Sequence, residues 1–199
     1  TEQALSAVMY TSHCMQEAEN GDTRSEKLLR LATPLLKMMA CRDNVPVATA
    51  SMETRGGLGY IEEWVNPRLV RDAQIGLLWE GTTNINALDV ITRAIKKENC
   101  GEALREDMNL ILDNASSCPG QLKSLLKNKI GRAIEFATIV AENPDSESEC
   151  RRAASGLYNA KTATLLASEG AKIGAEGGDA RRLILSRLVV DTRLTREIH

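Results

Sequence analysis

The chain has 199 residues, enough for one substantial domain or two small ones. Its formal net charge of −2 argues against a protein that binds nucleic acid over most of its surface. Only 3% of the residues are aromatic, with a single Phe, and this composition favours packed helices over a β-sandwich. No apolar run approaches the roughly 18 residues that a membrane span needs. The five cysteines include no Cys-x-x-Cys pair, which indicates reduced thiols in an intracellular protein rather than a zinc site.

Apolar residues at helical spacing predict helices over most of the chain, and strand signals are nearly absent. The predicted fold class is therefore all-α. In chain order, the expected helices cover residues 2–18, 23–39, 46–55, 83–95, 102–114, 121–141, 147–169 and 179–197.

Local signals set the expected boundaries. Residues 23–26 form a capping box in which Thr23 is the expected N-cap of the second helix. Pro34 then either kinks this helix or marks a later start. Residues 60–79 read as a loop with short turns, punctuated by Asn66-Pro67.

Two short motifs contain the candidate functional residues. Gly56, Gly57 and Gly59 form a glycine turn that is not a dinucleotide-binding fingerprint, because no strand precedes it. Taken alone it is a tight turn between helices. Glu80 lies near the start of a helix that begins at Thr82 or Thr83, where an ordinary carboxylate is favoured by the helix macrodipole.

Together these motifs resemble the signature of the acyl-CoA dehydrogenases. The matching blocks are residues 52–60 (METRGGLGY), 67–73 (PRLVRDA), 79–85 (WEGTTNI) and 88–89 (LD). Glu53, Trp79 and Leu88-Asp89 are most similar to the AidB-like, long-tailed branch of that family. The resemblance implies a C-terminal helical bundle over residues 1–97 and a helical tail extension over residues 98–199.

The resemblance also implies a reaction, the α,β-dehydrogenation of an acyl-CoA thioester with FAD as hydride acceptor. Glu80 is then the catalytic base that removes the α-proton. A solvated Glu, with a pKa near 4.3, is too weak for this task, so we expect burial in a dry pocket to raise its pKa. Trp79 and Gly81 are the expected substrate-binding residues.

Five residues are expected to bind FAD by the same resemblance. Glu53, Gly56 and Gly57 face the FAD of a neighbouring subunit, whereas Thr82 and Asn84 hold the FAD of their own subunit. Glu53 and Asn84 each stand where the family commonly has Gln. A carboxylate at position 53 cannot donate a hydrogen bond, which changes that contact.

A complete enzyme of this family also has an N-terminal helical domain and a β-domain over the flavin. We therefore expect a fragment or a shortened gene product that is inactive alone and works in a homo-oligomer, dimeric or tetrameric. The expected compartment is cytoplasm or mitochondrion, which the sequence does not separate.

The tail leaves a second class of function open. Residues 151–199 contain nine Arg or Lys against five Asp or Glu. Such a basic segment is either a salt-bridged or solvated helical face, or a nucleic-acid contact, for which Arg181 and Arg182 are the expected positions. The alternative to an enzyme is thus a helical module for oligomerisation or nucleic-acid binding.

Overall fold

The computed structural model describes residues 1–194, and over that range it consists of helices and turns without a strand. The all-α prediction is confirmed. None of the described helices is both long and apolar enough to cross a membrane. The elements are α1 Glu2–Glu19, α2 Thr23–Glu53, α3 Gly57–Tyr60, α4 Val65–Ile75, α5 Thr83–Asp89, the π-helix η1 Val90–Ile95, α6 Cys100–Asn114, α7 Gly120–Glu142, the 3₁₀-helix η2 Pro144–Glu149, α8 Cys150–Ala175 and α9 Arg181–Arg193.

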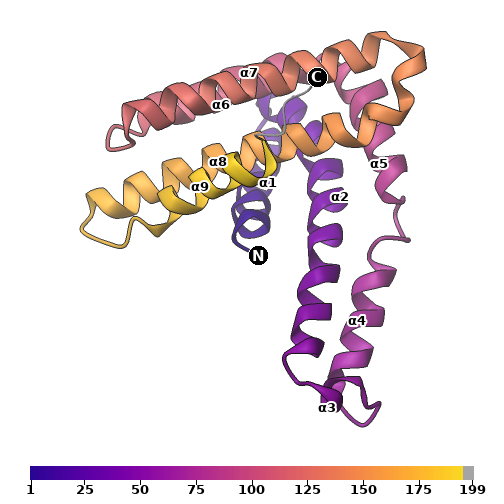
Figure 1. Ribbon diagram of the computed structural model, residues 1–199. Coiled ribbons are helices and arrows are strands. Elements are labelled where there is room, and N and C mark those ends of the chain that lie inside the picture. Colours follow the sequence, from indigo (N-terminus) through magenta and orange to yellow (C-terminus); the bar gives the residue numbers. More distant parts are fainter. Residues whose placement is uncertain (195–199) are drawn as a thin grey trace.

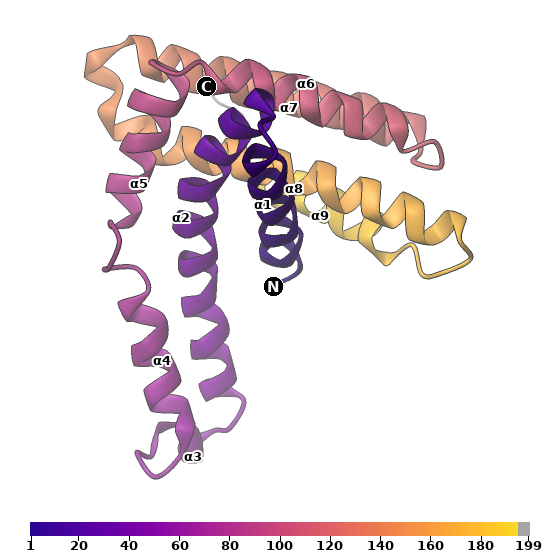
Figure 2. The ribbon, with the colours of Figure 1, turned by 180° about the vertical axis from the view of Figure 1, so that it is seen from behind.

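The helices form a packed body from which one arm projects. The far half of α2 runs beside α4, and the short α3 closes the tip of this arm (Figure 1). The helices α6 and α7 lie above α8 and α9, with α1 packed between α2 and α8, as the reverse view also shows (Figure 2). The arm therefore carries the glycine turn away from the body.

Helix α8 is the centre of the body. Every residue from Leu157 to Ala167 is buried, so this helix is surrounded on all sides. A Cβ atom at Gly170 would lie 2.6 Å from the backbone nitrogen of Leu183, so this glycine allows α9 to pack directly on α8. One hydrophobic core joins α1, α2 and η1 to α6, α7, α8 and α9. The predicted bundle and tail are thus packed around shared core residues.

Several boundaries differ from the expected ones. The N-cap of α2 is Asp22 and not Thr23, because the Asp22 carboxylate accepts hydrogen bonds from the backbone N–H groups of Arg24 and Ser25. Helix α2 continues without a break through Pro34 and ends at Glu53, so it includes residues 46–53 of the separate run expected at 46–55.

The loop predicted for residues 60–79 is wrong over residues 65–75, which form α4. Pro67 lies in the first turn of this helix, where the backbone N–H groups have no partner inside the helix and a missing one costs nothing. Asn66-Pro67 therefore marks a helix start and not a loop.

The tail helices α6, α7 and α9 begin within two residues of their predicted starts. The helix predicted at 147–169 is wrong at both ends, because α8 covers Cys150–Ala175. Helix α9 ends at Arg193, and residues 195–197 of its predicted range are outside the described residues.

Candidate functional site

The turn between α4 and α5 holds Glu80 in an unusual backbone conformation. Glu80 has a φ angle of 54° and the following Gly81 a φ angle of 90°. For a residue with a side chain, the left-handed conformation costs about 1–2 kcal/mol. Helix α5 begins at Thr83, as predicted, so Glu80 precedes it by three residues rather than lying in its first turn. Such an outlier, maintained against its cost, is typical of a functional position.

Two side chains fix this turn. The Lys37 ammonium of α2 donates hydrogen bonds to the carbonyl oxygens of Gly76 at 2.9 Å and Gly81 at 3.3 Å. The Asn86 amide nitrogen donates to the carbonyl oxygens of Gly81 at 2.8 Å and Thr82 at 3.1 Å. The backbone on both sides of Glu80 is therefore anchored. Sequence reasoning missed Lys37, because a single lysine in an apolar helix carries no distinguishing signal.

The side chains of this turn are open to solvent. Trp79 is 59% exposed, and Glu80 and Thr82 are also exposed. Among residues 1–194 no side chain forms a hydrogen bond or ion pair with the Glu80 carboxylate. The described residues therefore do not form the dry pocket that was expected around Glu80.

The glycine turn lies at the tip of the arm. Gly56 has a φ angle of 60°, and a Cβ atom at Gly56 or Gly57 would meet nothing within 4 Å. Gly59 differs, because a Cβ atom there would lie 2.1 Å from the carbonyl oxygen of Met52. Gly59 is therefore needed for the turn itself, whereas the exposed backbone at Gly56 and Gly57 is free to approach a ligand.

The glycine turn and Glu80 lie at opposite ends of α4 (Figure 1). The 11 residues of this helix span about 16 Å at 1.5 Å per residue. Glu53, Gly56 and Gly57 therefore form one group, and Trp79, Glu80, Gly81 and Thr82 form another. One chain does not bring the two groups together.

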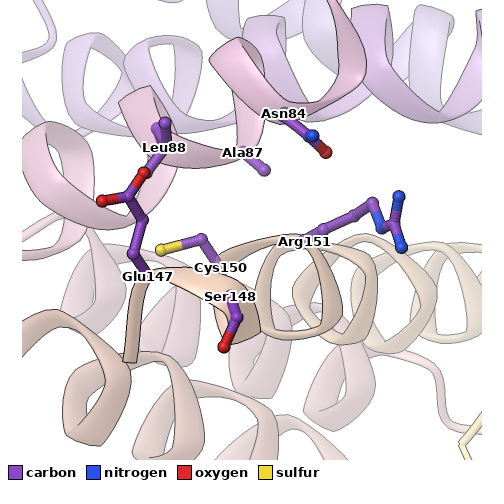
Figure 3. A pocket seen from close by; sticks show the side chains of 7 residues that line it. All are labelled: Asn84, Ala87, Leu88, Glu147, Ser148, Cys150 and Arg151. Carbon is purple, nitrogen blue, oxygen red and sulfur yellow. The ribbon is translucent and has the colours of Figure 1, made fainter. Parts of the chain in front are cut away.

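The Asn84 side chain points into a pocket of about 300 Å³ between α5 and the start of α8 (Figure 3). This pocket was not predicted from the sequence, because the basic charge of the tail was its only functional signal. Burial raises the pKa of the Cys150 thiol at its base, and the Glu147 carboxylate adds to this effect. The lining residues are Asn84, Ala87 and Leu88 from α5, and Glu147, Ser148, Cys150 and Arg151 from η2 and α8.

The arginines at the start of α9 form ion pairs within the chain. Arg181 forms an ion pair with Glu2 at 2.7 Å. Arg182 contacts Glu2 at 3.2 Å and also pairs with Glu169. The structure therefore favours the salt-bridged alternative for these two positions over a free basic face.

The sequence comparisons bear on the first half of the chain. Residues 2–96 match the family model described as the acyl-CoA dehydrogenase C-terminal domain. This segment belongs to that family. The family's glycine turn, Trp79-Glu80 turn and Asn84 all lie inside the match.

Relatives with curated descriptions extend the similarity. The chain is 38% identical over 123 residues to acyl-CoA dehydrogenase family member 11 of Caenorhabditis elegans, covering 62% of this chain and 19% of that protein. It is 39% identical over 77 residues to the putative acyl-CoA dehydrogenase AidB of Escherichia coli, covering 39% of this chain and 14% of that protein. The chain thus spans about a fifth or less of the length of these relatives.

The likeness of fold also includes the tail. The crystal structure of Caenorhabditis elegans ACDH-11 in complex with C11-CoA superimposes with a TM-score of 0.85 at 24% identity. The superposition covers 97% of this chain and 34% of that one. The predicted bundle with a helical extension is therefore confirmed as a fold.

Proposed function

We propose that the chain is the C-terminal part of an FAD-dependent acyl-CoA dehydrogenase of the AidB-like branch, acting on an acyl-CoA thioester. The observation that carries this proposal is the conformation of Glu80. The family match includes this residue, and the structure holds it at positive φ between carbonyl groups anchored by Lys37 and Asn86. A carboxylate on an anchored backbone, without an ion-pair partner among residues 1–194, is suited to act as a base.

Glu80 takes the proton from the α-carbon of the thioester onto a carboxylate oxygen. FAD, when bound, supplies the acceptor for the hydride that leaves the β-carbon. Because a carboxylate surrounded by water is a weak base, the proposed site has to exclude water from Glu80. Trp79 provides an apolar surface that additional protein can complete, and Gly81 lets the backbone pass close to the substrate.

The residues named for FAD fit a phosphate-containing nucleotide. Gly56 and Gly57 present backbone without nearby side chains, and the Asn84 amide has no partner among residues 1–194. Glu53 is exposed and accepts hydrogen bonds only, so it is suited to a hydroxyl group and not to a phosphate.

The separation of the two groups along α4 supports an oligomeric enzyme. In one chain the glycine turn and the Glu80 turn lie beyond opposite ends of α4, whose 11 residues span about 16 Å, so each group would serve a different cofactor. On this proposal two copies complete two sites, and the chain alone does not turn over substrate.

The experiment is anaerobic reduction of the flavin by acyl-CoA in the complete flavoprotein. The Glu80→Gln variant removes the base but keeps the shape of the side chain, so FAD remains bound while flavin bleaching is lost. Glu106→Gln, an exposed carboxylate on α6, is the matched control and should bleach normally. Undiminished bleaching by Glu80→Gln would refute the assigned base.

A further inference from the structure

The pocket between α5 and α8 joins a predicted cofactor residue to the tail. Asn84 comes from the segment that matches the family, whereas Arg151 comes from the first turn of α8. Figure 3 shows both polar ends at the same side of the pocket, with the Asn84 amide on the α5 side and the Arg151 guanidinium on the α8 side. Two donor groups from distant parts of the sequence thus converge on one space.

Neither side chain has another role in the described part of the chain. Within residues 1–194, Arg151 forms no ion pair, and the Asn84 amide forms no hydrogen bond. The adjacent Arg152 is different, because it lies 2.9 Å from Glu149 and 4.7 Å from the centre of the Phe136 ring. Arg151 is therefore the arginine of this pair that is available to a ligand.

The remaining groups restrict what the pocket can hold. The Glu147 carboxylate lies at the opposite end, beside Leu88 (Figure 3), and would repel an anion placed there. The raised pKa of the Cys150 thiol keeps it protonated near neutral pH, which removes it as a nucleophile or metal ligand. The pocket therefore suits a ligand with an anionic group at the Arg151 end and a hydrogen-bond donor at the Glu147 end.

We propose that Arg151 and Asn84 bind a phosphate group of a nucleotide. The planar guanidinium matches phosphate oxygens in a two-pronged contact, and the amide adds a neutral donor. A ribose hydroxyl of the same nucleotide can donate to Glu147. This inference rests on the proposed function, which supplies two candidate nucleotides: FAD and the coenzyme A thioester both contain an adenosine diphosphate unit. Whether the nucleotide is FAD or the coenzyme A thioester, the tail helix α8 is part of the ligand site as well as part of the core.

ADP is the probe for the shared unit, titrated into the 199-residue chain by calorimetry. Arg151→Gln should weaken ADP binding about tenfold, which corresponds to about 1.4 kcal/mol for the lost charged contact. Arg151→Lys keeps the charge and should recover part of the affinity. Arg187→Gln is the matched control, because it removes an exposed arginine of α9 whose partner is Asp191. Circular dichroism checks that each variant is folded.

The complete flavoprotein then separates the two sources. If Arg151 holds the cofactor, Arg151→Gln speeds FAD release from the holoenzyme; if it holds the substrate, the same variant weakens coenzyme A binding and leaves FAD release unchanged. No ADP binding by the wild-type chain, or equal binding by Arg151→Gln, overturns the inference. ADP binding that depends on Arg151 in a protein that retains no FAD supports the inference and contradicts the proposed function.

Discussion

The ammonium nitrogen of Lys37 lies 3.3 Å from the carbonyl oxygen of Gly81, the residue that follows the proposed base. Through this contact and the one to Gly76, helix α2 fixes the turn that carries Glu80. The proposed base is thus positioned by a residue 43 places earlier in the sequence, and not by the short helix α5 that follows it.

Replacing this lysine should loosen the turn. Lys37→Met keeps the apolar stem but removes the charged donor, and hydrogen bonds from charged groups contribute about 1.5–3 kcal/mol. We expect faster amide hydrogen exchange at residues 77–82, measured by mass spectrometry. Lys27→Met, an exposed lysine on the same helix, is the control and should leave exchange in this segment unchanged. Equal exchange in the two variants would contradict the anchoring role of Lys37.

The strained backbone at Glu80 predicts a stabilising substitution. Glu80→Gly removes the cost of the left-handed backbone conformation, about 1–2 kcal/mol. The greater conformational freedom of glycine in the unfolded chain offsets this gain by about 0.5–1 kcal/mol. The free energy of unfolding should therefore rise by roughly 0.5 kcal/mol in urea denaturation. Asn99→Gly, at the other non-glycine residue with positive φ among residues 1–194, should gain less because Asn tolerates this region. A loss of stability in Glu80→Gly would show that the conformation is not strained.

Gly81 should resist substitution. Its φ angle is 90°, and a Cβ atom would lie 3.2 Å from the amide nitrogen of Asn86, which anchors the turn. We expect Gly81→Ala to lower the free energy of unfolding by about 1 kcal/mol or more. The control is Gly120→Ala at the first residue of α7, where a Cβ atom meets nothing within 4 Å. Similar values for both variants would mean that the turn adapts freely.

Lys161 predicts a dependence of stability on pH. This lysine is 1% exposed, its amine has no hydrogen-bond partner among the described residues, and burial lowers its pKa from 10.5 to about 8. The rings of Tyr10 and Tyr158 lie 5.3 Å and 5.8 Å from the amine and compensate only in part. Because the folded chain binds the proton less tightly than the unfolded chain, the cost is full below pH 8, declines between pH 8 and 10.5, and is absent above.

Lys161→Met removes this cost. The fall in pKa corresponds to about 3 kcal/mol, from which the lost ring contacts subtract, so the variant should be about 2 kcal/mol more stable at pH 7. The advantage over wild type should shrink as the pH rises from 8 to 10 in urea denaturation. The pKa of Cys14 is raised chiefly by burial but is also lowered by the charge of Lys161, so both proteins carry Cys14→Ala in this measurement. An advantage that stays constant with pH would contradict a charged, buried lysine.

The sequence predicted the helical class and the tail helices because their apolar periodicity is long and regular. It failed at α4, where the proline was read as an interruption although Pro67 lies in the first turn of the helix. It also failed at the cap of α2, because Asp22 and Thr23 are both good caps and only the backbone geometry chooses between them.

The site residues came from motif resemblance, and their proposed chemistry stays a prediction. The sequence could name Glu80 and Asn84 but not Lys37 or Arg151, because those two meet the site only through the packing of α2 and α8. The positive φ of Glu80 could not be predicted either, since a glutamate before a glycine can adopt either sign of φ.

The central claim is that Glu80 removes the α-proton of a bound thioester. The most direct measurement is exchange of that hydrogen in deuterated water, followed by NMR with a 3-thia-acyl-CoA, whose sulfur in place of the β-carbon prevents dehydrogenation. In the complete flavoprotein we predict exchange by the wild type and by Glu106→Gln, and none above the buffer rate by Glu80→Gln with FAD still bound. Exchange at the wild-type rate in Glu80→Gln would contradict the account.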